Sequence, residues 1–189
     1  QGVKTLTEQD IIAADGSAGR DTPMQILPQQ QALAIAIKLC RAVQYAHERG
    51  IMHRDIKPSN VIIRRDGEPI LLDFGVAKMV NEPGDENLTM TGEFFGTLES
   101  MAPEQAQSSG EIDERADVYS IGAILYRLIT GRKHFVSGGH VLRDIEKLRY
   151  FDPVHPRSYN KIIDKDLQAI VLKALNPDPN RRYRSALLL

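Results

Sequence analysis

The sequence lacks the features that mark several classes of protein. Its one cysteine, Cys40, excludes an internal disulfide and a zinc cluster built from cysteines. The 24 Lys and Arg residues nearly balance the 25 Asp and Glu residues, so the formal net charge of −1 gives no electrostatic reason to bind nucleic acid or a membrane surface. The apolar runs are short or interrupted by charge, as by Arg127 within residues 121–129, and predict neither a membrane span nor a signal peptide. We therefore expect a cytoplasmic protein in a reducing compartment, with no membrane contact from this segment.

The residues that are present suffice for one globular domain. The chain has 189 residues, of which 42% are hydrophobic, and it shows no internal repeats. Residues 1–27 predict only a short helix and a surface loop, because the glycines of that loop follow no strand and do not complete a phosphate-binding pattern. Residues 28–189 carry the apolar periodicity of a packed domain.

Three segments of that region have the apolar spacing of helices. Residues 29–48 predict an amphipathic helix that starts after Pro28. Residues 117–130 are apolar around most of the helical circumference, which is typical of a helix in the middle of a domain. Residues 164–175 present one apolar face, and residues 185–189 predict the start of a final helix that is cut short. The expected fold is therefore mainly helical.

A small β-hairpin is predicted where two apolar runs flank the turn dipeptide Asp66-Gly67. With these two residues at the centre of the turn, the pairing places Asn60 opposite Asp73 at the open end of the hairpin. The same register pairs Arg65 with Glu68 and Ile62 with Leu71. An amide oxygen and a carboxylate side by side are hard ligands that suit Mg²⁺ bound to nucleotide phosphates.

Four motifs follow one another along the chain. They are His53-Arg54-Asp55-Ile56-Lys57-Pro58-Ser59-Asn60, Asp73-Phe74-Gly75, the stretch from Gly96 to Glu104 with its Ala102-Pro103-Glu104 ending, and Asp117-Val118-Tyr119-Ser120-Ile121-Gly122. Over about residues 30–185 the chain resembles the eukaryotic-like serine/threonine protein kinases, and around the motifs it is most similar to the bacterial branch. Lys57, two residues after Asp55, favours serine or threonine over tyrosine, and the Ala-Pro-Glu ending favours a protein over a small-molecule substrate.

The resemblance implies the carboxy-terminal lobe of such a kinase, mainly α with one small hairpin, and with the amino-terminal lobe absent. Residues 1–27 would follow the hinge between the lobes, and residues 28–189 would form the core of the lobe. The stretch Ile35–Lys38 imitates the V-A-I-K motif, whose lysine pairs with nucleotide phosphates, but that motif belongs on a strand well upstream. It falls here in a predicted helix, so we expect Lys38 to be solvated and Cys40 to be packed. Since no Gly-rich loop precedes the motifs, the chain alone is expected to be inactive.

The resemblance also implies a site that uses ATP and Mg²⁺, with Mn²⁺ as a substitute, to phosphorylate a protein substrate. Asp55 would accept the proton of the substrate hydroxyl, and Lys57 would stabilise the transferring phosphoryl group. Asn60 and Asp73 would bind the metal ion, and together with Lys57 they form the cofactor-binding set. Thr97 would bridge Asp55 and Lys57.

Residues 73–104 would form the activation segment of the kinase. Arg54 would bind a phosphate carried there by Thr89 or Thr91, because a guanidinium can hold a phosphate with two hydrogen bonds. The residues expected to be structural are His53, Phe74, Gly75, Glu104 paired with Arg182, and Asp117 bound to backbone N–H groups of the catalytic loop, residues 53–60.

Two residues depart from the family pattern, Ser100 in place of tyrosine and His134 in place of proline. The serine affects the packing of the loop that docks the peptide, and leaves the phosphoryl chemistry intact. The alternative is a pseudokinase or scaffold lobe that only binds proteins, although such a lobe would need none of the catalytic and metal-binding residues. A small-molecule kinase would need a different docking segment at residues 96–104. Apolar surfaces that a second lobe would cover lead us to expect self-association of the chain.

Overall fold

The computed structural model describes residues 26–64, 66–74, 98–106 and 112–189, and the structural statements below refer to these residues. The short helix and loop predicted before residue 26 lie outside them. Gly75, Thr89, Thr91 and Thr97 also lie outside, so the roles given to them remain predictions.

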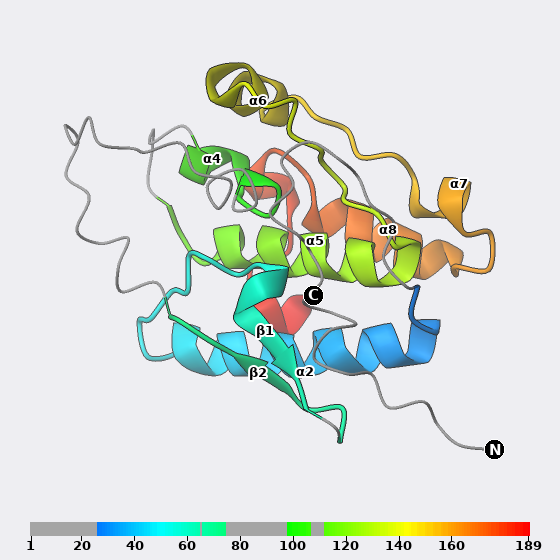
Figure 1. The fold of residues 1–189 in the computed structure, drawn as a ribbon. Coiled ribbons are helices and arrows are strands. Elements are labelled where there is room, and N and C mark those ends of the chain that lie inside the picture. Colours follow the sequence, from blue (N-terminus) through cyan, green and yellow to red (C-terminus); the bar gives the residue numbers. More distant parts are fainter. Residues whose placement is uncertain (1–25, 65, 75–97, 107–111) are drawn as a thin grey trace.

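Helix α5 (Arg115–Thr130) lies at the centre of the molecule, with α2 (Gln29–His47) on one side and α8 (Lys165–Ala174) on another (Figure 1). Every residue from Ala116 to Thr130 is buried, as expected for a helix that is apolar around its circumference. Gly131 ends the helix with φ 70°, a left-handed conformation that glycine adopts without strain. The predicted central helix is therefore confirmed.

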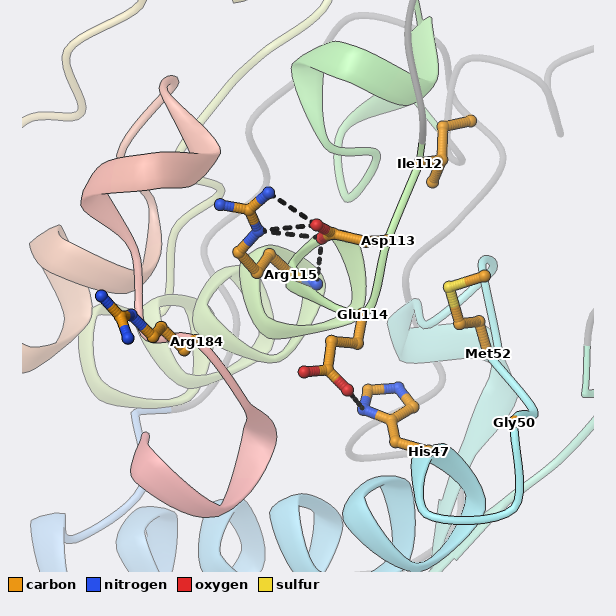
Figure 2. A pocket seen from close by; sticks show the side chains of 8 residues that line it. All are labelled: His47, Gly50, Met52, Ile112, Asp113, Glu114, Arg115 and Arg184. Atoms are coloured by element: carbon orange, nitrogen blue, oxygen red, sulfur yellow. Dashed lines mark hydrogen bonds and ion pairs between the residues drawn. The ribbon is translucent and has the colours of Figure 1, made fainter.

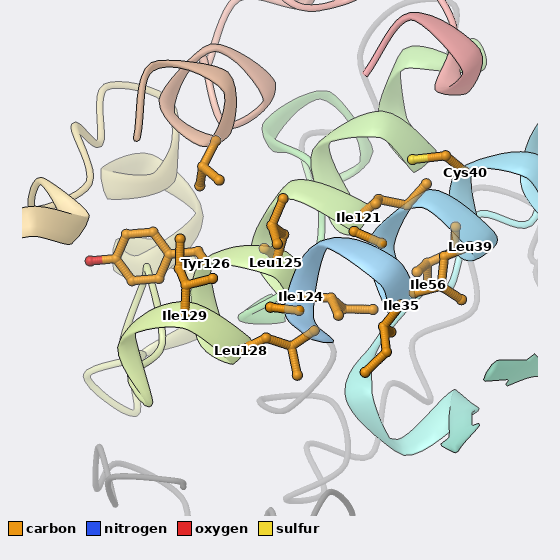
Figure 3. Close-up of a cluster of buried hydrophobic side chains, with 14 of the residues drawn as sticks. Ile35, Leu39, Cys40, Ile56, Ile121, Ile124, Leu125, Tyr126, Leu128 and Ile129 are labelled. Atoms are coloured by element: carbon orange, nitrogen blue, oxygen red, sulfur yellow. The ribbon is translucent and has the colours of Figure 1, made fainter. Parts of the chain in front are cut away.

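The main core fills the space between α2 and α5 (Figure 3). The buried face of α2 carries the helical spacing seen in the sequence and consists of Ala32, Ile35, Ala36, Leu39, Cys40, Val43 and Ala46. Burial raises the pKa of the Cys40 thiol to about 11, so this residue is a packed thiol, as predicted. On another side of α5, a Cβ at Gly122 would lie 2.8 Å from Ala174 Cβ, and the close approach of α8 therefore requires glycine there.

Shorter elements complete the described chain. They are the 3₁₀ turns η1 (Pro58–Asn60), η3 (Pro179–Arg181) and η4 (Ala186–Leu188), and the helices α4 (Pro103–Ala106), α6 (Val141–Leu148) and α7 (Pro156–Tyr159). A second apolar cluster of Leu98, Phe135 and Leu148 joins the segment before α4 to α6. In place of the start of a final helix predicted at residues 185–189, the structure has a single 3₁₀ turn, η4.

The β-hairpin forms where it was predicted, but the predicted register is wrong by one residue. Strands β1 (Val61–Ile63) and β2 (Pro69–Leu71) pair with Ile62 opposite Ile70. Arg64 N donates to Glu68 O at 2.9 Å, and Gly67 has φ 78°, so the loop has three residues with a left-handed glycine in place of a two-residue turn. Asn60 is consequently opposite Leu72, whose N–H donates to Asn60 O at 2.8 Å, and Asp73 lies one position beyond.

Lys38 lies on helix α2, as predicted, and not on a strand. Its ammonium group forms an ion pair with Glu68 and lies 3.4 Å from Gly67 O, so it fastens the tip of the hairpin to α2. No helix within the described residues is long and apolar enough to cross a membrane.

Candidate active site

The catalytic loop, residues 53–60, is held in shape by one buried carboxylate. Asp117 lies in the first turn of α5 and is 1% exposed. Its two oxygens accept the N–H groups of His53 and Arg54, each at 2.8 Å. This is the contact expected of a carboxylate buried at the start of a helix, because its desolvation must be offset by donors.

The backbone of Arg54 adopts a left-handed conformation, with φ 63°. For a residue with a side chain this costs about 1–2 kcal/mol, so the surrounding structure must impose it. Both backbone polar groups are fixed: the N–H by Asp117, and the carbonyl by Gln105 Nε2, which donates at 2.9 Å. The direction of the chain after Arg54 then determines where the side chain of Asp55 lies.

Asp55, Lys57 and Asn60 lie together at the end of this loop. Lys57 Nζ is 3.1 Å from Asp55 Oδ2, and the two side chains are only 12% and 17% exposed. Asn60 Nδ2 donates to Asp55 Oδ2 at 3.1 Å and to Asp55 O at 2.9 Å. A carboxylate oriented by an amide and an ammonium group can accept a hydrogen bond from a hydroxyl without reorganising.

His53 connects the loop to the hairpin and is fully buried. Its Nε2 lies 2.9 Å from Leu72 O, which can only accept, so Nε2 carries the proton and donates. Its Nδ1 accepts the N–H of Asp55 at 3.3 Å. Phe74 packs against the ring, with centroids 4.7 Å apart. His53 and Phe74 thus have the packing contacts expected for structural residues.

Asn60 and Asp73 offer the oxygens that suit a divalent metal ion. The amide nitrogen of Asn60 is directed at Asp55, so its oxygen is on the other side of the amide group. Asp73 is exposed, with φ 51°, immediately after Leu72. In the described part of the chain no group of three or more His, Cys, Asp or Glu residues could hold a metal. The amide oxygen of Asn60 and the carboxylate of Asp73 are hard ligands of the kind that suits Mg²⁺, an ion that takes other ligands from nucleotide phosphates and water.

The docking segment, defined here as residues 98–106, lies beside the catalytic loop. Besides the bond from Gln105 to Arg54, it is fixed by Glu104, whose two oxygens accept Arg182 Nη1 at 2.6 Å and Nη2 at 2.8 Å. The side chain of Arg182 is fully buried and also donates to three backbone carbonyls, those of Asn176, Arg115 and Pro177. The contact expected between Glu104 and Arg182 is present in bidentate form.

Sequence reasoning missed His47, the last residue of α2. Its Nε2 lies 2.8 Å from Asp117 Oδ2, so it supports the carboxylate that holds the catalytic loop. His47 also lines an open pocket of about 680 Å³, where Glu114 Oε2 is 3.7 Å from His47 Nδ1 (Figure 2). Of the described residues predicted to act on substrate or metal, Asp55, Lys57, Asn60 and Asp73, none lines this pocket.

The comparisons with known proteins bear on this arrangement. The sequence pattern of the protein kinase domain matches residues 14–188. The chain belongs to the protein kinase family. The chain is 37% identical over 184 residues to the serine/threonine-protein kinase PknB of Mycobacterium leprae, and that match covers 97% of the chain. It is 38% identical over 175 residues to a probable serine/threonine-protein kinase of Streptomyces coelicolor, a match that covers 91% of the chain.

These relatives are longer than the chain. The chain spans 28% of the Mycobacterium leprae protein and 25% of the Streptomyces coelicolor protein. A probable serine/threonine-protein kinase of Clostridium perfringens, 32% identical over 184 residues, is likewise matched over 25% of its length. The resemblance to bacterial serine/threonine kinases is confirmed, and so is a mainly helical fold with a two-stranded antiparallel sheet.

Proposed function

We propose that the protein carrying this chain transfers the γ-phosphoryl group of ATP to serine and threonine hydroxyls of a protein substrate. The observation that carries the proposal is the cluster of Asp55, Lys57 and Asn60 on a loop whose backbone is fixed by Asp117. Phosphoryl transfer depends chiefly on positioning and charge stabilisation, and a pre-shaped loop supplies the first of these.

Asp55 is the catalytic base in this proposal. It accepts a hydrogen bond from the substrate hydroxyl and takes the proton as the oxygen bonds to phosphorus. Lys57, 3.1 Å from Asp55, places a positive charge where negative charge accumulates on the transferring group. The bond from Asn60 Nδ2 keeps the carboxylate of Asp55 from turning away from the hydroxyl.

Asn60 and Asp73 are proposed to hold Mg²⁺, for which Mn²⁺ can substitute. The ion, when bound, would neutralise the phosphate oxygens of ATP. Asn60 is held by its amide nitrogen to Asp55, so that its oxygen has a fixed direction. The left-handed backbone of Asp73 directs its carboxylate from a defined point at the end of the hairpin. Thr97 is proposed to bridge Asp55 and Lys57.

Regulation by phosphorylation of the activation segment belongs to the same proposal. Arg54 is fixed through its backbone on the catalytic loop, and its guanidinium can bind a phosphate on Thr89 or Thr91. The bound phosphate would order the segment next to the substrate.

We also propose that residues 1–189 alone transfer little phosphate. Their sequence contains no Gly-rich loop, and the only V-A-I-K-like lysine, Lys38, is on a helix and engaged with Glu68. ATP would then be held from one side only. A scaffold that merely binds proteins is less well supported, because it has no use for the intact Asp55, Asn60 and Asp73.

The test is phosphate transfer from radiolabelled Mg-ATP to an arrayed set of serine- and threonine-containing peptides, using the natural full-length protein. We expect Asp55→Asn to reduce kcat by about 10²–10⁴-fold, which is the usual contribution of a general base, while Mg-nucleotide binding persists. Asp73→Asn should weaken metal-dependent nucleotide binding as well, as calorimetry with a nonhydrolysable Mg-ATP analogue would measure.

Full activity in Asp55→Asn would overturn the role of this residue. Failure of the wild-type protein to label any peptide would overturn the function. Strong transfer by residues 1–189 alone would contradict only the proposal that the chain needs further structure above the nucleotide.

A further inference from the structure

The docking segment is joined to the loop between α5 and α6 by a mostly buried ion pair, Glu99 with Lys133, to which the sequence analysis gave no role. Glu99 comes immediately before Ser100, and Lys133 follows the end of α5. Their side chains are 9% and 12% exposed. Lys133 Nζ is 2.8 Å from Glu99 Oε1 and 2.7 Å from Oε2, so the ammonium group bonds to both carboxylate oxygens.

The surroundings of Glu99 make its charge depend on this lysine. Leu98 is fully buried next to it, within the apolar cluster that includes Phe135. Burial raises the pKa of the Glu99 carboxyl, and the hydrogen bond and charge of Lys133 oppose that rise together with the charge of Arg127 and a backbone hydrogen bond from Ser137. Without the lysine, an ionised Glu99 would lose its closest compensation.

Ser100, which stands where the family has a tyrosine, leaves the docking segment less firmly packed, and the ion pair of Glu99 with Lys133 offsets this loss. The serine side chain is short and buried, and the carbonyl of Ser100 accepts Ser120 Oγ at 2.8 Å. A small side chain packs against fewer atoms than an aromatic ring does, so it fixes the segment less. The ion pair of Glu99 and Lys133 attaches the segment one residue earlier and to a different element.

We propose that Lys133 is a positioning residue for the substrate peptide, because its pairing with Glu99 fixes the docking segment beside Asp55. The inference rests on the proposed kinase function. Residues 98–106 are connected to the catalytic loop through Gln105 and Arg54, so a shift of the segment moves a bound peptide relative to the base. The metal-binding side chains are on the loop and hairpin, and the pair does not determine how they bind nucleotide.

Removing one partner of a buried ion pair leaves an uncompensated charge, whereas replacing both partners by apolar residues removes the charge altogether. In Lys133→Met the Glu99 carboxyl either turns toward water and carries the segment with it, or takes up a proton, and in both cases the segment loses its attachment to the loop after α5. Lys133→Arg keeps a charge and donors for both oxygens. The double substitution Glu99→Leu with Lys133→Met leaves no charge to expose.

The experiment measures kcat and KM for ATP, and separately for the best-labelled peptide of the arrayed set, with the natural full-length protein. We expect Lys133→Met to raise the peptide KM about tenfold, which is the effect of one lost favourable contact. The KM for ATP should stay within twofold. Lys133→Arg and the double variant should recover most of the peptide affinity, and the exposed control Lys161→Met should match the wild type.

Backbone hydrogen exchange of residues 98–106 provides a second readout that needs no activity. It should accelerate in Lys133→Met and not in Lys161→Met. Equal exchange together with an unchanged peptide KM in Lys133→Met would overturn the inference, and so would a loss that Lys133→Arg does not rescue. If the wild-type protein labels no peptide, the proposed function fails, and the exchange result alone then decides whether Lys133 fixes the segment.

Discussion

The catalytic loop and the docking segment both rest on helix α5, but different kinds of contact hold them. The loop is fixed through its backbone, since the N–H groups of His53 and Arg54 bond to Asp117. The docking segment is fixed mainly through its side chains, by the pairs of Glu104 with Arg182 and Glu99 with Lys133, and Ser120 Oγ also donates to its backbone at Ser100 O. Among the contacts of the described residues, the hydrogen bond from Gln105 Nε2 to Arg54 O links the two regions directly.

This difference separates the shape of the catalytic loop, which does not depend on the loop's own side chains, from the placement of the substrate, which depends on side chains of the docking segment. Asp117 sets the shape of the loop through backbone N–H groups, and the side chains of Asp55 and Lys57, which pair with each other, are the ones proposed to face the reactants. Contacts made by side chains depend on residue identity, so substitutions in them can change how a substrate is placed without changing the chemistry. Ser100 and His134 are departures from the family pattern: Ser100 lies in the docking segment, and His134 follows Lys133, which pairs with Glu99 of that segment.

The largest effect should come from removing the backbone support of the catalytic loop. Asp117→Ala leaves three buried partners without an acceptor: the N–H groups of His53 and Arg54, and Nε2 of His47. Each unsatisfied buried group costs about 1–3 kcal/mol, so we expect the free energy of unfolding to fall by about 3–6 kcal/mol. Urea denaturation measures it, with the exposed residue in Asp152→Ala as a control that should change stability by less than about 0.5 kcal/mol. A loss of less than about 1 kcal/mol in Asp117→Ala would contradict the support.

The next largest effect should come from the anchor of the docking segment. Arg182→Leu leaves Glu104 without its bidentate partner and three carbonyls without a donor, so the unfolding free energy should fall by about 3–5 kcal/mol. The neighbouring Arg181 is a matched control, because its side chain is 76% exposed and its pairing with Asp178 is at the surface. Arg181→Leu should cost less than about 1 kcal/mol. Equal losses from the two arginines would show that burial of the pair is not what matters.

Which of these contacts the sequence can predict depends on whether an element or a motif forces them. A carboxylate at the start of a buried helix must find donors, so the bonds of Asp117 follow from its position. The contact between Glu104 and Arg182 follows from the family resemblance. His47 and Gln105 carry no such signal, because their partners lie 70 and 51 residues away and no motif spacing connects them. The contact between Lys133 and Glu99 was missed for the same reason, because the two residues are 34 positions apart and no motif spacing connects them.

The hairpin shows a different limit of the sequence. Asp66-Gly67 fits a two-residue turn and also the end of a three-residue loop, since glycine can take the left-handed position in either. The structure has the three-residue loop, with Gly67 at φ 78°. The register that results places Asp73 one position beyond the predicted pairing with Asn60. The elements and their order were predictable, whereas the register depended on a single dihedral choice.

A pH-dependent effect of intermediate size distinguishes the docking side of the molecule. Burial lowers the pKa of His134 to about 3, and burial raises the pKa of Tyr119, so the tyrosine hydroxyl donates to a neutral Nε2 at 2.9 Å. The unfolded chain takes up this proton near pH 6.5 and the folded chain does not, so stability is lost as the pH falls from about 6.5 toward 3. At pH 5 the loss due to His134 should be about 2 kcal/mol.

His134→Gln isolates this contribution, because glutamine can accept the same hydrogen bond and does not titrate. Urea denaturation of both proteins at pH 7.5 and pH 5 should show the additional acid-induced loss only in the wild type. Identical changes with pH in the two proteins would mean that His134 is protonated in the folded state.

The smallest effect should come from the direct link between the two regions. Gln105→Ala removes the hydrogen bond that Nε2 donates to Arg54 O and the one that Oε1 accepts from Ala102 N, and it should lower the free energy of unfolding by about 1–2 kcal/mol. The bond to Arg54 O helps to hold Arg54 in its left-handed conformation. Without it the catalytic loop should loosen slightly, and kcat should fall a few-fold. Gln30→Ala, at an exposed position of α2, is the matched control. If the two variants had the same stability and the same kcat, the bond from Gln105 to Arg54 O would not support the catalytic loop.

The most direct test of separate support is backbone hydrogen exchange of both regions in two variants of the natural full-length protein. We predict that Asp117→Asn, which keeps one acceptor, accelerates exchange in residues 53–60 more than in residues 98–106. Lys133→Met should show the reverse order. Acceleration of both regions to the same extent in either variant would contradict the account, because the catalytic loop and the docking segment would then be a single unit.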